Sequence, residues 1–196
     1  MTPGARAQMS MDILRALEVS ARPADRLIDQ WFRDRRFAGS GDRRFISGLV
    51  YQILRRRAEL LWLIDGFKGD GDEAEVRPLV IAALMHLQDW QLSEFETGFT
   101  GSGHNPAPLS DAELTLAEQI TTRQKAVMPP HISGNFPEWL STHLQRRFGD
   151  DLLVEMTAMN ERAAIDLRVN TLMTNQEDVL SALAAEGFEA GPGKYS

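Results

Sequence analysis

Apolar residues recur at helical spacing along most of this chain. Within residues 42–67, the apolar side chains from Ile46 to Leu54 share one face of an α-helix, and the pattern resumes at Leu60. The interruption is a run of three arginines at 55–57. We predict a central helix whose apolar face anchors a bundle. Its arginines either face a polyanion or form a solvated flank whose stems cover the core.

The same spacing predicts further helices on both sides. The first begins at Ser10, which can cap it, after disordered residues 1–9. A second lies within residues 21–37, and a turn at 39–42 ends in Asp42 as the N-cap of the central helix. The remaining helices of the first 162 residues are predicted at 75–90, 110–124, 137–149 and 150–161.

Two stretches rich in turn residues divide the chain. Glycine, proline and asparagine cluster at 99–109, which we predict to be a connector, and Ser110 with Glu113 then matches a capping box. Residues 128–139, MPPHISGNFPEW, interrupt regular structure again, and we place a domain boundary near 126–137. We therefore predict three segments, which are a helical domain over 1–126, linker helices over 127–162 and a different unit over 163–196.

The last segment changes its pattern. Residues 165–170 alternate between apolar and polar side chains as a strand does, and 175–186 return to helical spacing before Gly187. Residues 188–190 can begin another strand. The predicted fold class is therefore mainly α, with a small β-α-β unit at the end. Because that unit is half-built, we expect it to be truncated.

Composition limits the function classes. Hydrophobic residues make up 43% and charged residues 25% of 196 residues, which is ordinary for a soluble globular protein. There is no cysteine, so disulfides, thiolate metal sites and cysteine nucleophiles are excluded from this segment. No membrane span or signal region is visible, and we expect a cytoplasmic protein.

The formal net charge of −7 is unevenly distributed. Residues 1–69 contain 13 Lys and Arg against 8 Asp and Glu, and twelve of those cations are arginine. Arginine suits bidentate phosphate contact better than lysine does. The asymmetry is what a nucleic-acid-facing domain shows, although an acidic protein partner or a bundle without ligand is compatible with it.

No catalytic constellation is visible in these residues. The four histidines share no metal-ligand spacing, and His86 lies in an apolar helix where it is expected to pack in the core. Neither GSG at 101–103 nor GPG at 191–193 lies between a predicted strand and a helix as a phosphate-binding loop does. We predict no metal site and no catalytic residue in this segment.

Short motifs spread over nearly the whole chain carry a family resemblance. In the first half they are DRRF at 42–45, LVY at 49–51, LR at 54–55 and LWLI at 61–64. In the second half they are FPEWL at 136–140, RFG at 147–149, Asn160, LRVNTL at 167–172 and LAAEG at 183–187. Together they resemble the amino-terminal part of the Sun/Fmu (RsmB) family of ribosomal RNA cytosine-C5 methyltransferases.

The resemblance implies a function for the parent protein. It implies a NusB-like helical RNA-binding domain, then an RNA-recognition-like β-α-β subdomain, then a Rossmann-type domain that binds S-adenosylmethionine and supplies two cysteines. Those cysteines and the glycine-rich cofactor loop are not among these residues. We therefore expect a segment that holds ribosomal RNA, of the small subunit, without modifying it or binding the cofactor.

Candidate RNA contacts follow from the charge pattern and from the resemblance. Arg168 and Asn170 share one face of the predicted strand, although Arg168 can instead form a local salt bridge. Two other interpretations stay open, which are a NusB-like module acting through a protein partner and a helical regulatory domain without nucleic acid. The candidate contacts are Arg33, Arg35, Arg36, Arg43, Arg44, Arg55, Arg56, Arg57, Arg168 and Asn170.

Overall fold

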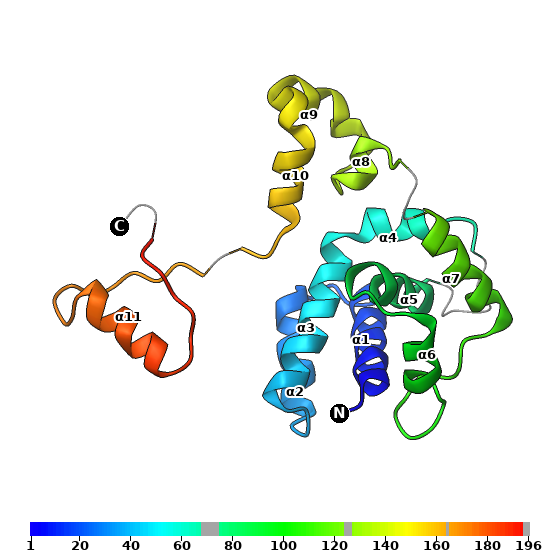
Figure 1. Cartoon of the computed structure of the whole chain (residues 1–196), viewed down its shortest axis with the longest axis horizontal. Coiled ribbons are helices and arrows are strands. Elements are labelled where there is room, and N and C mark those ends of the chain that lie inside the picture. Colours follow the sequence, from blue (N-terminus) through cyan, green and yellow to red (C-terminus); the bar gives the residue numbers. More distant parts are fainter. Residues whose placement is uncertain (68–74, 124–126, 164, 194–196) are drawn as a thin grey trace. The chain divides into compact units, whose positions relative to one another are not determined.

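The computed structural model describes residues 1–67, 75–123, 127–163 and 165–193, and these contain helices but no strand. Contacts within the chain divide it into two compact units, Met1–Asn160 and Glu161–Ser196 (Figure 1). The boundary predicted near 126–137 stays a prediction, and the loop predicted at 68–73 lies outside the described residues. No helix in the described ranges is long and apolar enough to cross a membrane.

The first unit is built from ten α-helices and two short 3-10 helices within the described ranges. Seven helices surround one large apolar core, and the last three lead into a smaller one (Figure 1). In chain order they are α1 (Pro3–Glu18), α2 (Ala24–Asp34), α3 (Ser40–Arg55), α4 (Arg57–Leu63), α5 (Val76–Leu87), α6 (Leu92–Gly98), α7 (Asp111–Arg123), α8 (Pro130–Ser133), η1 (Glu138–Leu140), α9 (Ser141–Phe148), η2 (Gly149–Asp151) and α10 (Leu152–Asn160).

Helix α1 packs against α2, α3, α5 and α6, so it holds the centre of the bundle together with α3. It begins at Pro3, and the predicted disorder of residues 1–9 is wrong. The Thr2 hydroxyl caps it by accepting the Ala5 N–H at 3.1 Å. Ser10 lies inside the helix, fully buried, and donates its hydroxyl to the Arg6 carbonyl at 2.9 Å. Sequence spacing missed this start because small residues form the buried face of the first two turns.

The predicted helix over 42–67 is two helices. The chain bends at Arg56, whose φ is −110° and ψ is 25°, so that α3 ends before it and α4 begins after it. Gly39 is the N-cap of α3, and Asp42 lies in its first turn, where it accepts the Arg6 Nε at 2.7 Å. Periodicity did not reveal the bend because neither glycine nor proline marks it and the apolar residues on both sides stay buried.

Helix α5 confirms its prediction, including Pro78 near its start, and residues 79–84 are all buried. The predicted capping box opens α7, since the Ser110 N–H donates to Glu113 Oε2 at 2.9 Å. Helix α6 was not predicted. Its Phe95 packs edge-on against Trp90, with ring centroids 5.2 Å apart.

The smaller core of the first unit is formed by Phe136, Leu152 and Met156. The elements around it, η1, α9, η2 and α10, correspond to the two helices predicted at 137–149 and 150–161. The Asn160 side chain ties the end of α10 to this core by donating to the Gly134 carbonyl at 2.9 Å.

The second unit contains one described helix, α11 (Gln176–Ala185), which confirms the predicted helix. Asn175 Oδ1 caps it by accepting the Asp178 N–H at 2.9 Å, and Gly187 ends it with φ of 80°. The predicted β-α-β unit is not shown, because the described residues of 165–170 and 188–190 form no strand. A strand requires a paired neighbour, and neither segment has one in the described part of the chain.

Candidate nucleic-acid interface

Arginines of α2 and α3 line an open groove. The groove has a volume of about 430 Å³, and its apolar floor includes Ile28 and Phe32, both buried. Arg33, Arg43 and Arg44 form its cationic wall. Arg33 follows Phe32 directly on α2, so its stem leaves the buried face and its guanidinium reaches solvent. The groove therefore combines positive charge with access for a large anion.

These three arginines are held to different degrees. Arg43 is fixed, because its Nε donates to the Ala38 carbonyl at 2.8 Å and its guanidinium lies 5.6 Å from the Phe32 ring. Arg33 is only loosely paired, since its Nη2 lies 3.9 Å from Asp29 and its side chain is 68% exposed. Arg44 is exposed and has no ion pair among the described residues. Two of the three can therefore contact phosphate without first losing a strong partner.

The turn between α2 and α3 carries two more candidate arginines. The Arg35 guanidinium lies 3.7 Å from the centroid of the Trp31 ring, and it is half-buried there. Arg36 is exposed and has no ion pair within the described ranges. The structure thus brings five of the predicted contacts, from Arg33 to Arg44, to one end of α3.

The run at 55–57 lies at the opposite end of the same helix. Twelve residues separate Arg43 from Arg55, which is about 18 Å along a helix. Arg56 Nε lies 3.0 Å from Glu59, and Arg57 Nη2 lies 2.6 Å from Glu75. Arg55 is half-buried. The single basic surface expected from the sequence is therefore divided, and two of the three arginines in its second half are paired with carboxylates.

Glu59 organises the polar contacts at that end. It is 7% exposed, and its Oε1 lies 2.6 Å from His86 Nε2. Burial alone raises the pKa of Glu59, but the hydrogen bond with His86 and the charge of Arg56 outweigh burial and hold this pKa below its ordinary value. His86 is therefore a partner of a buried carboxylate, and it is not enclosed only by apolar side chains as the sequence suggested.

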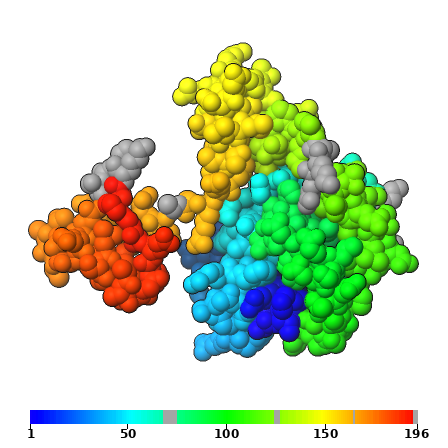
Figure 2. Space-filling view, in the orientation of Figure 1, coloured from blue at the N-terminus to red at the C-terminus, as the bar shows by residue number. Residues whose placement is uncertain are grey.

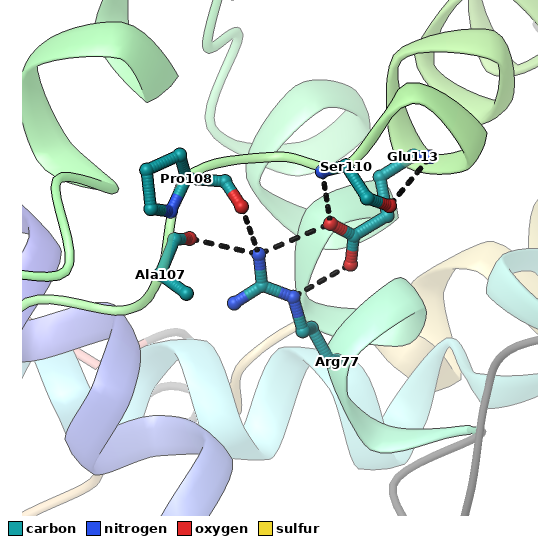
Figure 3. A network of polar contacts seen from close by, with 5 residues as sticks. All are labelled: Arg77, Ala107, Pro108, Ser110 and Glu113. Atoms are coloured by element: carbon teal, nitrogen blue, oxygen red, sulfur yellow. Dashed lines mark hydrogen bonds and ion pairs between the residues drawn. The ribbon is translucent and has the colours of Figure 1, made fainter.

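A second buried pair, missed by sequence reasoning, fixes the connector at 99–109. Arg77 on α5 donates Nε to Glu113 Oε1 at 2.6 Å and Nη2 to the Ala107 carbonyl at 2.9 Å (Figure 3). Burial raises the pKa of Glu113, yet the hydrogen bonds from Arg77 and from the Ser110 N–H lower it overall. Only the Ser110–Glu113 capping spacing signalled part of this network. Its role is structural.

Arg168 and Asn170 lie in the second unit and are both exposed. Arg168 forms no ion pair or hydrogen bond with any described residue. The Asn170 carbonyl accepts the Met173 N–H at 2.9 Å, and its Oδ1 accepts the Leu172 N–H at 3.2 Å. Asn170 therefore stabilises a turn, and the strand face that the two residues were expected to share is not formed in the described structure.

One comparison with known families gives a match. Residues 136–196 match the sequence model of a family described as the ferredoxin-like domain of RsmF/B-like methyltransferases. The matched range includes α9, α10 and the second unit. No curated protein matches the chain. No solved structure matches it either.

The match agrees with the resemblance seen in the sequence at the level of a methyltransferase family. The chain contains a region similar to a domain of RsmF/B-like methyltransferases. Helices α1 to α7, which carry most of the arginines, all lie before the matched range. The groove between α2 and α3 is therefore a feature of the part of the chain that precedes this domain.

Proposed function

We propose that this chain is the RNA-binding amino-terminal part of an rRNA methyltransferase. The methyl group would come from S-adenosylmethionine and pass to cytosine C5 in a catalytic domain outside these 196 residues. The observation that carries the proposal is the match of residues 136–196 to a domain of RsmF/B-like methyltransferases. The helical bundle acts in this proposal as the NusB-like module that holds ribosomal RNA.

The groove between α2 and α3 is the proposed phosphate-binding surface. Arg33 and Arg44 are exposed there, Arg43 is held against the floor of the groove, and Arg36 is exposed in the adjoining turn. A guanidinium that is free of strong carboxylate partners binds phosphate without the loss of an existing ion pair. The ion-paired Arg56 and Arg57 contribute less, because each must first leave a carboxylate.

RNA binding across a salt gradient tests this proposal. The full chain, titrated with small-subunit rRNA fragments, should lose affinity steeply as salt rises, because neutralised phosphates release counterions. A double variant, Arg33→Glu with Arg44→Glu, should lose most of the binding. The matched control is Arg146→Glu with Arg147→Glu on α9, which changes the net charge equally at another exposed site.

Two outcomes contradict the proposal in different ways. Absence of RNA binding at low salt would overturn the RNA-binding function of the chain. Equal losses in the two double variants would leave RNA binding in place but would remove the groove as its site, since overall charge alone would then explain the affinity.

A further inference from the structure

A second hollow is bordered by the turn between α2 and α3. It has a volume of about 720 Å³ and is lined by α1, by this turn and by the loop at 103–105. In Figure 2 the first residues of α1 (blue) reach the surface between the α3 segment (cyan) and the green atoms that follow α6. Ala5 and Met9 provide apolar surface inside it. This volume is in the range of small-molecule sites.

Phe37 presents an aromatic ring at the mouth of this hollow. Its side chain is 72% exposed, which is unusual for a phenylalanine. The turn that carries it is anchored, because Ala38 is buried and the Ala38 carbonyl accepts Arg43 Nε at 2.8 Å. Phe37 is therefore held outward by a fixed backbone. An exposed ring beside cations is a platform on which nucleic-acid bases stack.

Arg35 provides a second flat surface in the same hollow. Its guanidinium is stacked on Trp31 at 3.7 Å from the ring centroid, and it also lines the hollow. Because the indole fixes the guanidinium, little side-chain freedom is lost when another flat group contacts it. Arg35 and Phe37 are two residues apart in one anchored turn, so both can contact the same ligand.

Two of the polar groups that line the hollow are the carboxylates of Asp12 and Asp42, beside Gln8, His104 and Asn105. Asp12 accepts Gln8 Nε2 at 2.9 Å and Arg15 Nη1 at 3.1 Å, and its side chain is 41% exposed. Asp42 accepts Arg6 Nε at 2.7 Å, and this hydrogen bond holds the pKa of Asp42 below its ordinary value. Carboxylates repel phosphate and accept hydrogen bonds. Both carboxylates are paired with cations, since the Met1 ammonium also lies 3.6 Å from Asp42 Oδ2. Their remaining lone pairs can accept hydrogen bonds from a flat group that brings donors, and the exposed arginines outside the hollow suit the phosphates.

From this arrangement we infer that the hollow binds one unpaired base of single-stranded RNA, stacked on Phe37 and Arg35, with its amino group facing Asp12 and Asp42. The phosphates on either side lie along Arg36 and the groove arginines Arg33 and Arg44. Adenine, cytosine and guanine carry an amino group, and uracil does not. The inference rests on the proposed RNA-binding function and adds the kind of RNA and the position of the base.

The test measures binding of the full chain to short single-stranded RNAs and to a duplex of the same length. Base stacking on an aromatic ring contributes enough that Phe37→Ala should weaken single-strand binding about tenfold. Phe37→Trp should retain binding, and neither change should alter duplex binding. Because the Phe37 side chain is 72% exposed, both variants should fold normally, which circular dichroism checks.

Base preference provides the second measurement. The chain should bind oligoadenylate or oligocytidylate more tightly than oligouridylate, and Asp12→Asn should reduce that preference. If single strands bind but Phe37→Ala and base identity have no effect, the base site is overturned while RNA binding stands. If the chain binds neither single-stranded nor duplex RNA, the proposed function fails and the base site fails with it.

Discussion

Arginines gather in two regions of the helical unit, and their surroundings differ. Around α4, α5 and α7, Arg56, Arg57 and Arg77 each lie within 3.0 Å of a carboxylate oxygen. Around the start of α3, Arg36 and Arg44 are exposed and have no ion pair among the described residues. The number of arginines in residues 1–69 therefore does not show how many are available to bind phosphate. Nearby carboxylates, three residues along the chain for Arg56 and from more distant segments for Arg57 and Arg77, decide which arginines remain available.

The two sets of arginines should contribute to different properties, the paired ones to stability and the exposed ones to RNA binding. A half-buried arginine paired with a buried carboxylate protects that carboxylate from being left without a partner. An exposed arginine contributes little to stability but is free to contact phosphate. Substitutions of Arg56 and Arg77, whose partners Glu59 and Glu113 are buried, should therefore change unfolding. Arg57 pairs with the exposed Glu75 and should matter less. Substitutions in the second region should change RNA affinity.

The largest effect is expected for Arg77→Ala. Its side chain is 16% exposed and that of Glu113 is 9% exposed, so the change leaves a buried carboxylate without its main partner. The free energy of unfolding, measured by urea denaturation, should fall by about 3 kcal/mol. The control Arg26→Ala removes an exposed arginine and should change it by less than about 0.5 kcal/mol. Equal effects would contradict a structural role for the Arg77 network.

Glu59→Gln should lower the free energy of unfolding by a smaller amount, about 2 kcal/mol at neutral pH, because His86 and Arg56 lose a buried carboxylate partner. The folded-state pKa of Glu59 lies below its ordinary value of 4.5. The stability contributed by the ionised form is therefore present above pH 4.5 and is lost as pH falls through the lower folded-state pKa.

Thermal unfolding at several pH values checks this expectation. The difference in Tm between the natural chain and the Glu59→Gln variant should be largest near neutral pH and should shrink below pH 4.5. A difference that stays constant down to pH 3 would show that the charge of Glu59 does not stabilise the fold.

Local signals in the sequence predicted several elements well. The apolar run of α5, the Ser110–Glu113 capping box and the end of α11 at Gly187 all depend on neighbouring residues. The bend at Arg56 and the early start of α1 depend on packing against other helices. Strands need partners from elsewhere, so alternation at 165–170 could not establish one.

The candidate site was predictable only in part. Charge counting identified the arginines of α2 and α3, but it could not separate them from Arg57, whose partner Glu75 is distant in the sequence. Phe37 was missed because a single apolar residue in a turn has no periodicity. Phe37 is exposed because the buried Ala38 and the ion-paired Asp42 fix the turn around it, and this depends on the three-dimensional structure.

An intermediate effect is expected when two groove arginines are neutralised together, and RNA affinity should then fall about tenfold. Each phosphate contact on a single strand contributes about 0.7 to the slope of log affinity against log salt. Arg33→Gln with Arg44→Gln should therefore reduce that slope by about 1.4, if each residue neutralises one phosphate. Arg57→Gln removes an equally charged side chain that is already paired, so it should leave the slope unchanged. Equal slopes for both variants would contradict the distinction between the two regions.

The smallest effect is expected for Arg168, in the second unit. On a regular strand Asp166 and Arg168 would share a face and could pair, but the described structure contains neither the strand nor an ion pair at Arg168. Arg168→Ala, Asp166→Ala and the double variant should each change the hydrogen-exchange stability of α11 by less than about 0.5 kcal/mol, with no coupling between them. A coupling energy above that value would show that the two side chains interact and that the strand face forms in solution.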